Sequence, residues 1–126
     1  MPVLDVDGLR KALNADPEFR LASRLWTARL LLRIGEQPYV FEISNGEVER
    51  IVDAVTIFDP WDIELAGPAD GWDQLLQREP PPFYQDVFPA ILHHGFRMGG
   101  DLEALFAYYP AVRRMVDVMR AGNATV

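Results

Sequence analysis

Two adjacent histidines are the side chains of this chain best suited to chemistry, because imidazole serves both as an acid–base group and as a metal ligand. His93 and His94 are its only histidines, and the segment ILHHGFRMGGD that holds them continues to a glycine pair and Asp101. A metal site needs three or four ligands, cysteine is absent, and adjacent helical residues point about 100° apart. We therefore expect the histidines to end a helix, where the helix dipole favours positive charge, and we predict no metal or other cofactor.

Asp59 provides the main alternative, since a buried carboxylate beside a histidine can be tuned for proton transfer. The sequence does not show whether Asp59 lies near His93 or His94 in space. Gly99-Gly100 matches no phosphate-binding motif, and neither serine lies in a GxSxG elbow. No catalytic residue is assigned. An alternative hypothesis is a small enzyme or pathway accessory protein that acts on an apolar substrate, with Asp59, His93 or His94 as acid–base residues.

Charge and composition exclude several classes of partner. The chain has 126 residues, a net charge of −7 and 49% hydrophobic residues, which suits one globular domain over residues 1–126. Its negative charge opposes binding to nucleic acids and anionic membranes. No stretch reaches the roughly 20 apolar residues of a membrane helix, so no stable membrane insertion is predicted. Without cysteine or a secretory leader, a cytoplasmic protein is expected.

Period-two patterns predict a group of strands in the first half of the chain. Apolar residues alternate over residues 26–34 and again over residues 39–44, which is typical of half-buried strands. Asn45-Gly46 suits a tight turn into a third strand, so the three strands should form an antiparallel meander. Residues 55–59 and 61–67 are also strand-like.

Helical spacing dominates the two ends of the chain. A first helix is expected between a capping Asp5 and Pro17, and further helices over residues 72–76, 84–91 and 102–119, the last interrupted at Pro110. One short strand is expected near Phe96, and Asp101 should cap the helix after it. Segregated strands and helices predict an α+β two-layer domain, with helices on one face of a mainly antiparallel sheet.

Bulky apolar side chains are concentrated near the carboxyl end. They are Phe83, Tyr84, Phe88, Met98, Phe106, Tyr108, Tyr109, Met115 and Met119. Aromatic residues at helical spacing usually form core, and composition alone favours that interpretation. Methionine also adapts to varied ligands, and pockets for apolar molecules are lined by such residues. The cluster therefore indicates either plain core or a ligand pocket.

Three segments, taken in order, resemble a known family. They are SNGEV after the second strand, WDIELAGPADGWDQLL leading from a strand into a Trp-led helix, and FRMGGDLEALFAYY, a short strand closed by Gly-Asp before a helix. From about Leu9 to Met119 the chain resembles the sterol carrier protein 2 family. The resemblance implies a five-stranded sheet covered by helices. It also implies a hydrophobic tunnel between them for fatty acyl chains, acyl-CoA or sterols.

The resemblance and the apolar cluster together predict a ligand site. The residues expected to line it are Trp72, Leu76, Phe83, Phe88, Met98, Leu105, Phe106, Tyr109, Met115 and Met119. The leading hypothesis is a non-catalytic carrier that holds a hydrophobic small molecule between sheet and helices. The acidic charge and the added helix after Pro110 depart from the family pattern. An adaptor for partner enzymes and a homodimer also stay open.

Overall fold

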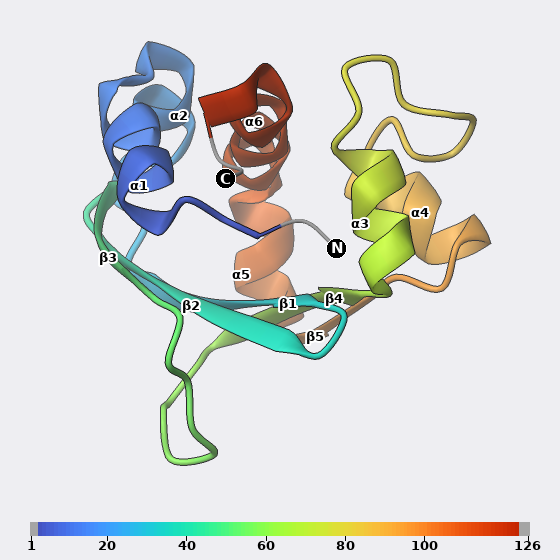
Figure 1. Cartoon of the computed structure of the whole chain (residues 1–126). Coiled ribbons are helices and arrows are strands. Elements are labelled where there is room, and N and C mark those ends of the chain that lie inside the picture. The colour runs from blue at the N-terminus through green and yellow to red at the C-terminus, as the bar shows by residue number, and fades with distance from the viewer. Residues whose placement is uncertain (1–2, 124–126) are drawn as a thin grey trace.

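The computed structural model describes residues 3–123, which form one sheet with helices packed on a single face (Figure 1). Helices from both ends of the chain lie above the sheet in that view. On the other side, only the connection from the third strand to the fourth projects away from it. The predicted α+β two-layer architecture is confirmed.

Five strands make up the sheet, in the spatial order β3-β2-β1-β4-β5. They are β1 (Ala28–Ile34), β2 (Gln37–Ser44), β3 (Glu47–Val52), β4 (Ile63–Gly67) and β5 (Arg97–Gly100). Neighbouring strands are antiparallel except for β1 and β4, which run parallel at the centre of the sheet. The prediction of a mainly antiparallel sheet is confirmed, while the parallel pair was not predicted.

The β2–β3 hairpin has the turn expected from its sequence. Asn45 and Gly46 have φ values of 49° and 79°, the left-handed conformation that a two-residue turn requires and that Asn and Gly adopt at low cost. A side chain at Gly46 would also collide with the carbonyl oxygen of Ser23. This turn fixes the register in which Ser44 faces Glu47.

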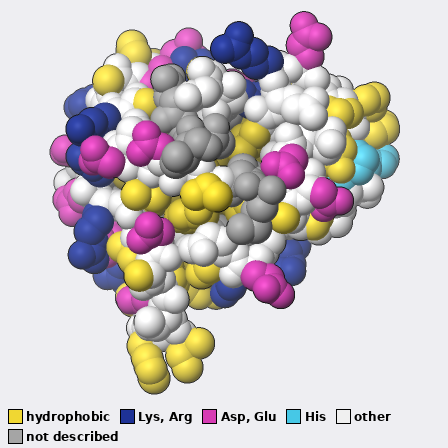
Figure 2. Space-filling model, in the orientation of Figure 1, with side chains coloured by type: hydrophobic (Ala, Val, Ile, Leu, Met, Phe, Trp, Pro, Cys, Tyr) yellow, Lys and Arg dark blue, Asp and Glu magenta, His cyan; other side chains and the backbone are white. Residues whose placement is uncertain are grey.

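The prediction of a strand over residues 55–59 is wrong. These residues form a turn instead, because the Asp59 carboxylate accepts a hydrogen bond from the Thr56 amide (2.6 Å), and the Thr56 hydroxyl accepts one from the Phe58 amide (3.2 Å). Ile57 and Phe58 are 93% and 87% exposed. Figure 2 shows hydrophobic side chains at the end of this projection.

Six α-helices and one π-helical turn are assigned within residues 3–123. They are α1 (Val6–Ala15), α2 (Pro17–Ala22), α3 (Ala69–Leu75), α4 (Val87–His93), α5 (Leu102–Ala107), α6 (Tyr109–Val118) and η1 (Met119–Asn123). The predicted caps are present: Asp5 accepts from the Gly8 amide and Asp101 from the Ala104 amide. Helix α2 was not predicted, and α4 begins three residues later than Tyr84.

The core lies between the helices and the inner face of the sheet. Alternate residues of β1 and β2, such as Leu30, Leu32 and Phe41, are fully buried there, in one cluster with apolar residues of α1, α5 and α6. The predicted inward face of Trp26 to Ile34 is confirmed. Within the described residues, no helix combines the length and hydrophobicity needed to cross a bilayer.

Candidate ligand-binding region

The ten residues predicted to line a ligand site all lie on the helical side of the sheet or on its last strand, at three depths. Buried in the core are Trp72, Leu105, Met115 and Met119. Partly buried are Leu76, Met98 and Tyr109. Exposed are Phe83, Phe88 and Phe106. Their role in binding stays a prediction.

The buried members belong to one continuous apolar core. Trp72 is held by two contacts: its indole N–H donates to the Arg33 carbonyl (2.8 Å), and its ring lies 5.2 Å from that of Phe96. Met115 and Met119 belong to the same buried cluster. Surface hollows of about 50 to 440 Å³ occur elsewhere in the described part of the chain, and those lined by Thr27 and Asp62, by Ala12 and Ala121, by Gly35 and Arg97, by Val6 and Ile51, and by Arg29 and Pro60 include none of the ten predicted residues. In this conformation the predicted interior is occupied by side chains.

Two of the three exposed members, Phe88 of α4 and Phe106 of α5, mark a surface patch. Phe88 and Phe106 are 41% and 52% exposed, and their ring centroids lie 6.1 Å apart. Leu92 and Leu102 stand one turn away on the same two helices and are also exposed. We name Phe88, Leu92, Leu102 and Phe106 the α4–α5 patch. It lies directly over the partly buried Tyr109, whose ring packs edge-on against Phe88.

Tyr109 fastens α4 to α6 beneath this patch. Its hydroxyl oxygen accepts a hydrogen bond from the Phe88 amide (3.1 Å) and lies beside Asp86, which also pairs with Arg113 (3.4 Å). Burial, and then the negative charge of Asp86, raise the pKa of Tyr109 well above its ordinary value of 10. The phenol stays protonated and serves as an anchor.

The two histidines hold the proline-rich segment against α4. His93 stacks on Phe83 and His94 on Tyr84, each at 3.8 Å between ring centroids. Nε2 of His94 also donates to the Pro82 carbonyl (3.0 Å). The prediction that they end a helix is confirmed, since α4 ends at His93.

Asp59 is remote from both histidines. It lies in the projection on the outer face of the sheet, where it lines a small hollow with Arg29 and Glu42, while α4 lies on the helical face (Figure 1). The structure therefore does not assemble the acid–base set of Asp59, His93 and His94. No group of three or more His, Asp or Glu residues within 3–123 is placed to hold a metal ion.

Arg120 is a structural residue that sequence patterns did not reveal. Its side chain is only 13% exposed, and it donates to the Leu75 carbonyl (2.7 Å) and to the Tyr84 and Gln85 carbonyls (2.8 Å each). It thus joins η1, which directly follows α6, to the end of α3 and to the segment before α4. A single arginine near a helix end gives no sequence signal for such contacts.

Trp26 was predicted only as an inward-facing residue, and the structure gives it a second feature. Its ring stacks on Tyr108, with centroids 5.2 Å apart and planes inclined by 12°. Its indole nitrogen is buried and has no hydrogen-bond partner within residues 3–123. Among the buried side-chain nitrogen and oxygen atoms of the described residues, it alone lacks one. Buried donors are normally paired, so this N–H could serve a ligand acceptor.

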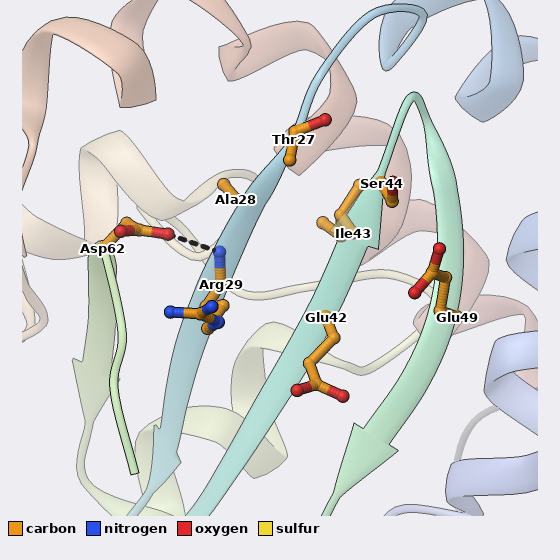
Figure 3. A pocket seen from close by; sticks show the side chains of 8 residues that line it. All are labelled: Thr27, Ala28, Arg29, Glu42, Ile43, Ser44, Glu49 and Asp62. Atoms are coloured by element: carbon orange, nitrogen blue, oxygen red, sulfur yellow. Dashed lines mark hydrogen bonds between the residues drawn. The ribbon is translucent and has the colours of Figure 1, made fainter.

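A polar hollow of about 380 Å³ lies on the opposite, outer face of the sheet (Figure 3). Side chains of β1, β2 and β3 project into it, among them Arg29, Glu42 and Glu49, with Asp62 at its border. Asp62 accepts a hydrogen bond from the Arg29 amide (2.7 Å). Arg50 pairs with Glu42 and lowers the pKa of that carboxyl below its ordinary value. Such charged walls suit a polar partner rather than a lipid tail.

Sequence comparison finds no matching family profile and no significantly similar curated protein. Structural comparison is informative. The chain is similar to the crystal structure of sterol carrier protein 2, with a TM-score of 0.70 and 18% identity over 90% of this chain and 92% of that chain.

Two further structures agree. The solution structure of a conserved hypothetical protein from Thermus thermophilus, suggested to be a sterol carrier protein, gives a TM-score of 0.63 and 18% identity over 90% of this chain and 82% of that one. UbiJ-SCP2, a ubiquinone synthesis protein, gives a TM-score of 0.56 and 17% sequence identity over 88% of each chain. At these identities the likeness establishes the fold: the chain has the α+β fold of sterol carrier protein 2. The resemblance noted in the sequence is confirmed at that level.

Proposed function

We propose that this protein binds a hydrophobic small molecule, such as a fatty acyl chain or a sterol, between the sheet and helices α4, α5 and α6. The observation that carries the proposal is the fold shared with sterol carrier protein 2 over 90% of the chain. The α4–α5 patch supports it, because exposed apolar side chains there adjoin the buried core. No cofactor is needed for binding of this kind.

The proposed path starts at the surface, where Phe88 contacts both Phe106 and the partly buried Tyr109. Met115 and Met119 lie in the core, farther along the helical segment that begins at Tyr109. Thioether side chains have three rotatable bonds and refill irregular space readily. The methionines could therefore move aside for a ligand and close the core again when it leaves.

Burial of an apolar tail provides the driving force for such a rearrangement, and its size depends on the length of the tail. Each buried methylene contributes about 0.8 kcal/mol, so ten of them contribute about 8 kcal/mol. Much of this is offset by the loss of ligand freedom on association, which costs roughly 4–15 kcal/mol. A long apolar tail is therefore required, and short or polar molecules should bind poorly.

The test is titration of delipidated protein with a fluorescent sixteen-carbon fatty acid and a fluorescent sterol. We expect saturable binding of at least one. Phe106→Asp should weaken it about tenfold or more, because it places a charge at the exposed end of the path. Leu21→Ser, which changes an exposed leucine on α2, is the matched control and should leave affinity unchanged.

Native mass spectrometry of the protein as purified gives an independent readout, since a retained lipid adds its mass to the folded chain. Absence of saturable binding to both probes, together with purified protein that carries no lipid, would reject the proposal. Equal affinity in Phe106→Asp and wild type would reject the path through the α4–α5 patch while leaving lipid binding itself established.

A further inference from the structure

The connection between β3 and β4, residues 53–62, displays apolar side chains where they contribute nothing to the core. We name it the β3–β4 loop. It projects from the face of the sheet that carries no helix (Figure 1), and hydrophobic side chains stand at the end of the projection (Figure 2). Ile57 and Phe58, in the turn of this loop, are almost fully exposed. Soluble proteins rarely concentrate apolar side chains on a projection unless they contact something.

The end of this loop is a structured turn. The Asp59 amide donates to the Thr56 carbonyl (3.1 Å), and the Asp59 carboxylate accepts from the Thr56 amide. The Thr56 hydroxyl accepts from the Phe58 amide. These bonds surround Ile57 and Phe58 and hold both side chains outward, so the apolar surface is already organised before any partner arrives.

Acidic side chains outnumber basic ones around the loop: Arg29 and Arg50 line the two hollows beside it, against Glu42, Glu49, Asp59 and Asp62. No Lys or Arg occurs from residue 51 to residue 77, whereas the loop itself contains Asp53, Asp59 and Asp62. The outer-face hollow adjoins it, because Arg29 and Glu42 line both that hollow and the smaller one beneath Asp59 and Pro60. Arg50 neutralises Glu42, but Glu49 forms no ion pair within the described residues.

We propose that the β3–β4 loop and the outer-face hollow together dock a basic protein partner. Ile57 and Phe58 would enter an apolar pocket of that partner, and Lys or Arg side chains around the pocket would reach Glu49 and Asp62. Charge selects this occupant. A second copy of a chain with net charge −7, or an anionic bilayer, would be repelled by the same carboxylates. The surface lies on the face opposite the α4–α5 patch, so docking and lipid binding are separable.

A synthetic amphipathic helical peptide made only of leucine and lysine serves as the probe, since it presents an apolar stripe flanked by ammonium groups. Its binding to the full chain is measured by fluorescence anisotropy of a label on the peptide. We expect Ile57→Ser with Phe58→Ser to weaken binding about tenfold or more, because two apolar contacts are lost. Glu49→Lys should weaken it severalfold and reduce the dependence on salt.

Leu21→Ser is the control for loss of an exposed apolar side chain elsewhere, and it should bind the peptide like wild type. Thermal unfolding of each variant checks that the fold is kept, which is expected because Ile57 and Phe58 lie outside the core. Peptide affinity that is the same in wild type and the loop double variant would overturn the proposal.

Two parallel measurements test the other occupants. Sedimentation with vesicles of phosphatidylcholine, alone or mixed with phosphatidylglycerol, tests a membrane, and analytical ultracentrifugation tests self-association. We expect neither vesicle binding nor self-association to depend on Ile57 and Phe58. Loop-dependent vesicle binding or loop-dependent dimer formation would overturn the proposal whatever the peptide does.

Discussion

Trp26 combines a large apolar ring with a buried donor that lacks an acceptor within residues 3–123. An unpaired buried polar group costs about 1–3 kcal/mol, so a sequence that keeps one needs a compensating benefit. Stacking on Tyr108 explains why a flat ring is suitable here, but any aromatic residue would stack. The indole N–H adds hydrogen bonding to the apolar interior, which a ligand hydroxyl or carbonyl could use.

Trp26→Phe separates these two contributions. The smaller ring loses packing and leaves a cavity, while removal of the unpaired N–H relieves its penalty, so the unfolding free energy should change by less than about 1 kcal/mol. Affinity for a long-chain alcohol should fall about three- to tenfold relative to the alkane of the same length. Urea unfolding and ligand titration measure the two effects. Equal weakening for alcohol and alkane would show that the N–H does not contact the ligand.

Asp16 joins two helices and caps one of them. Its carboxylate accepts from the Phe19 amide (2.8 Å) at the start of α2 and receives two hydrogen bonds from Arg114 of α6 (2.9 and 2.8 Å). The hydrogen bonds from Arg114, the largest influence, lower the pKa of Asp16 below its ordinary value of 3.8. A carboxyl with a lowered folded-state pKa contributes stability above pH 3.8, and that contribution is lost as the pH falls through the folded value.

Asp16→Asn should therefore lower the unfolding free energy at pH 7 by about 2 kcal/mol, through a weaker cap and the lost ion pair. The difference in unfolding free energy between Asp16→Asn and wild type should narrow below about pH 4, because protonation of Asp16 then removes the same contribution from wild type. Urea unfolding at pH 7, 5, 4 and 3 measures it. Glu18→Gln is the control, since Glu18 is exposed and lies 3.5 Å from Arg114. If the difference in unfolding free energy between Asp16→Asn and wild type did not change with pH, the stabilising role of the Asp16 carboxylate would be contradicted.

At the scale of elements, the sequence predicted what short-range patterns determine. The alternation of β1, the turn at Asn45-Gly46 and the cap at Asp101 all depend on residues within a few positions of each other. The parallel pairing of Leu30 with Ile63 depends instead on which sheet edge stays open after β2 has paired, a non-local outcome. Local periodicity carries no information about it.

The failed strand at residues 55–59 has a different cause. Val, Thr, Ile and Phe favour strands only when a neighbouring strand or core contacts them. Here Thr56 and Asp59 close a turn with their side chains, and Pro60 follows. Helical spacing likewise placed Phe88 and Phe106 among the apolar residues of two separate helices. The spacing could not show that both side chains would remain exposed.

Arg120 fixes the end of α3 and the segment before α4 to the carboxyl-terminal helical segment. Its replacement should therefore loosen these two regions and leave the sheet intact. Arg120→Ala leaves the carbonyls of Leu75, Tyr84 and Gln85 without this donor, and we expect a loss of about 2–3 kcal/mol. Hydrogen exchange should rise over residues 76–86 and stay unchanged in β1 and β2.

Arg113→Ala is the matched control for Arg120→Ala. Arg113 is exposed and makes one 3.4 Å ion pair with Asp86, so its loss should cost less than about 1 kcal/mol. Arg120→Lys should restore little, because one ammonium group cannot reproduce the fork of a guanidinium. If Arg120→Ala and Arg113→Ala raised exchange over residues 76–86 equally, the assigned role of Arg120 would be wrong.

For the molecule as a whole, one face of the sheet carries all of the described helices and the other carries only the β3–β4 loop (Figure 1). This division separates the two proposed activities: an apolar ligand on the helical side and a basic partner on the open side. The helical side is closed in this conformation, since Trp72, Met115 and Met119 are buried. If the protein binds the proposed ligand, uptake requires movement of the methionine side chains and of the helices that hold them against the sheet.

That requirement predicts the kinetics of binding. If opening precedes capture, the observed association rate in stopped-flow mixing with a fluorescent fatty acid should rise with ligand concentration and then reach a plateau set by opening. Arg120→Ala should raise the plateau, because it releases the end of α3 and the segment before α4, whereas Arg113→Ala should leave it unchanged. A rate that increases linearly at all concentrations and is equal in both variants would show that ligand binds without this movement, and the region between sheet and helices would no longer be the site.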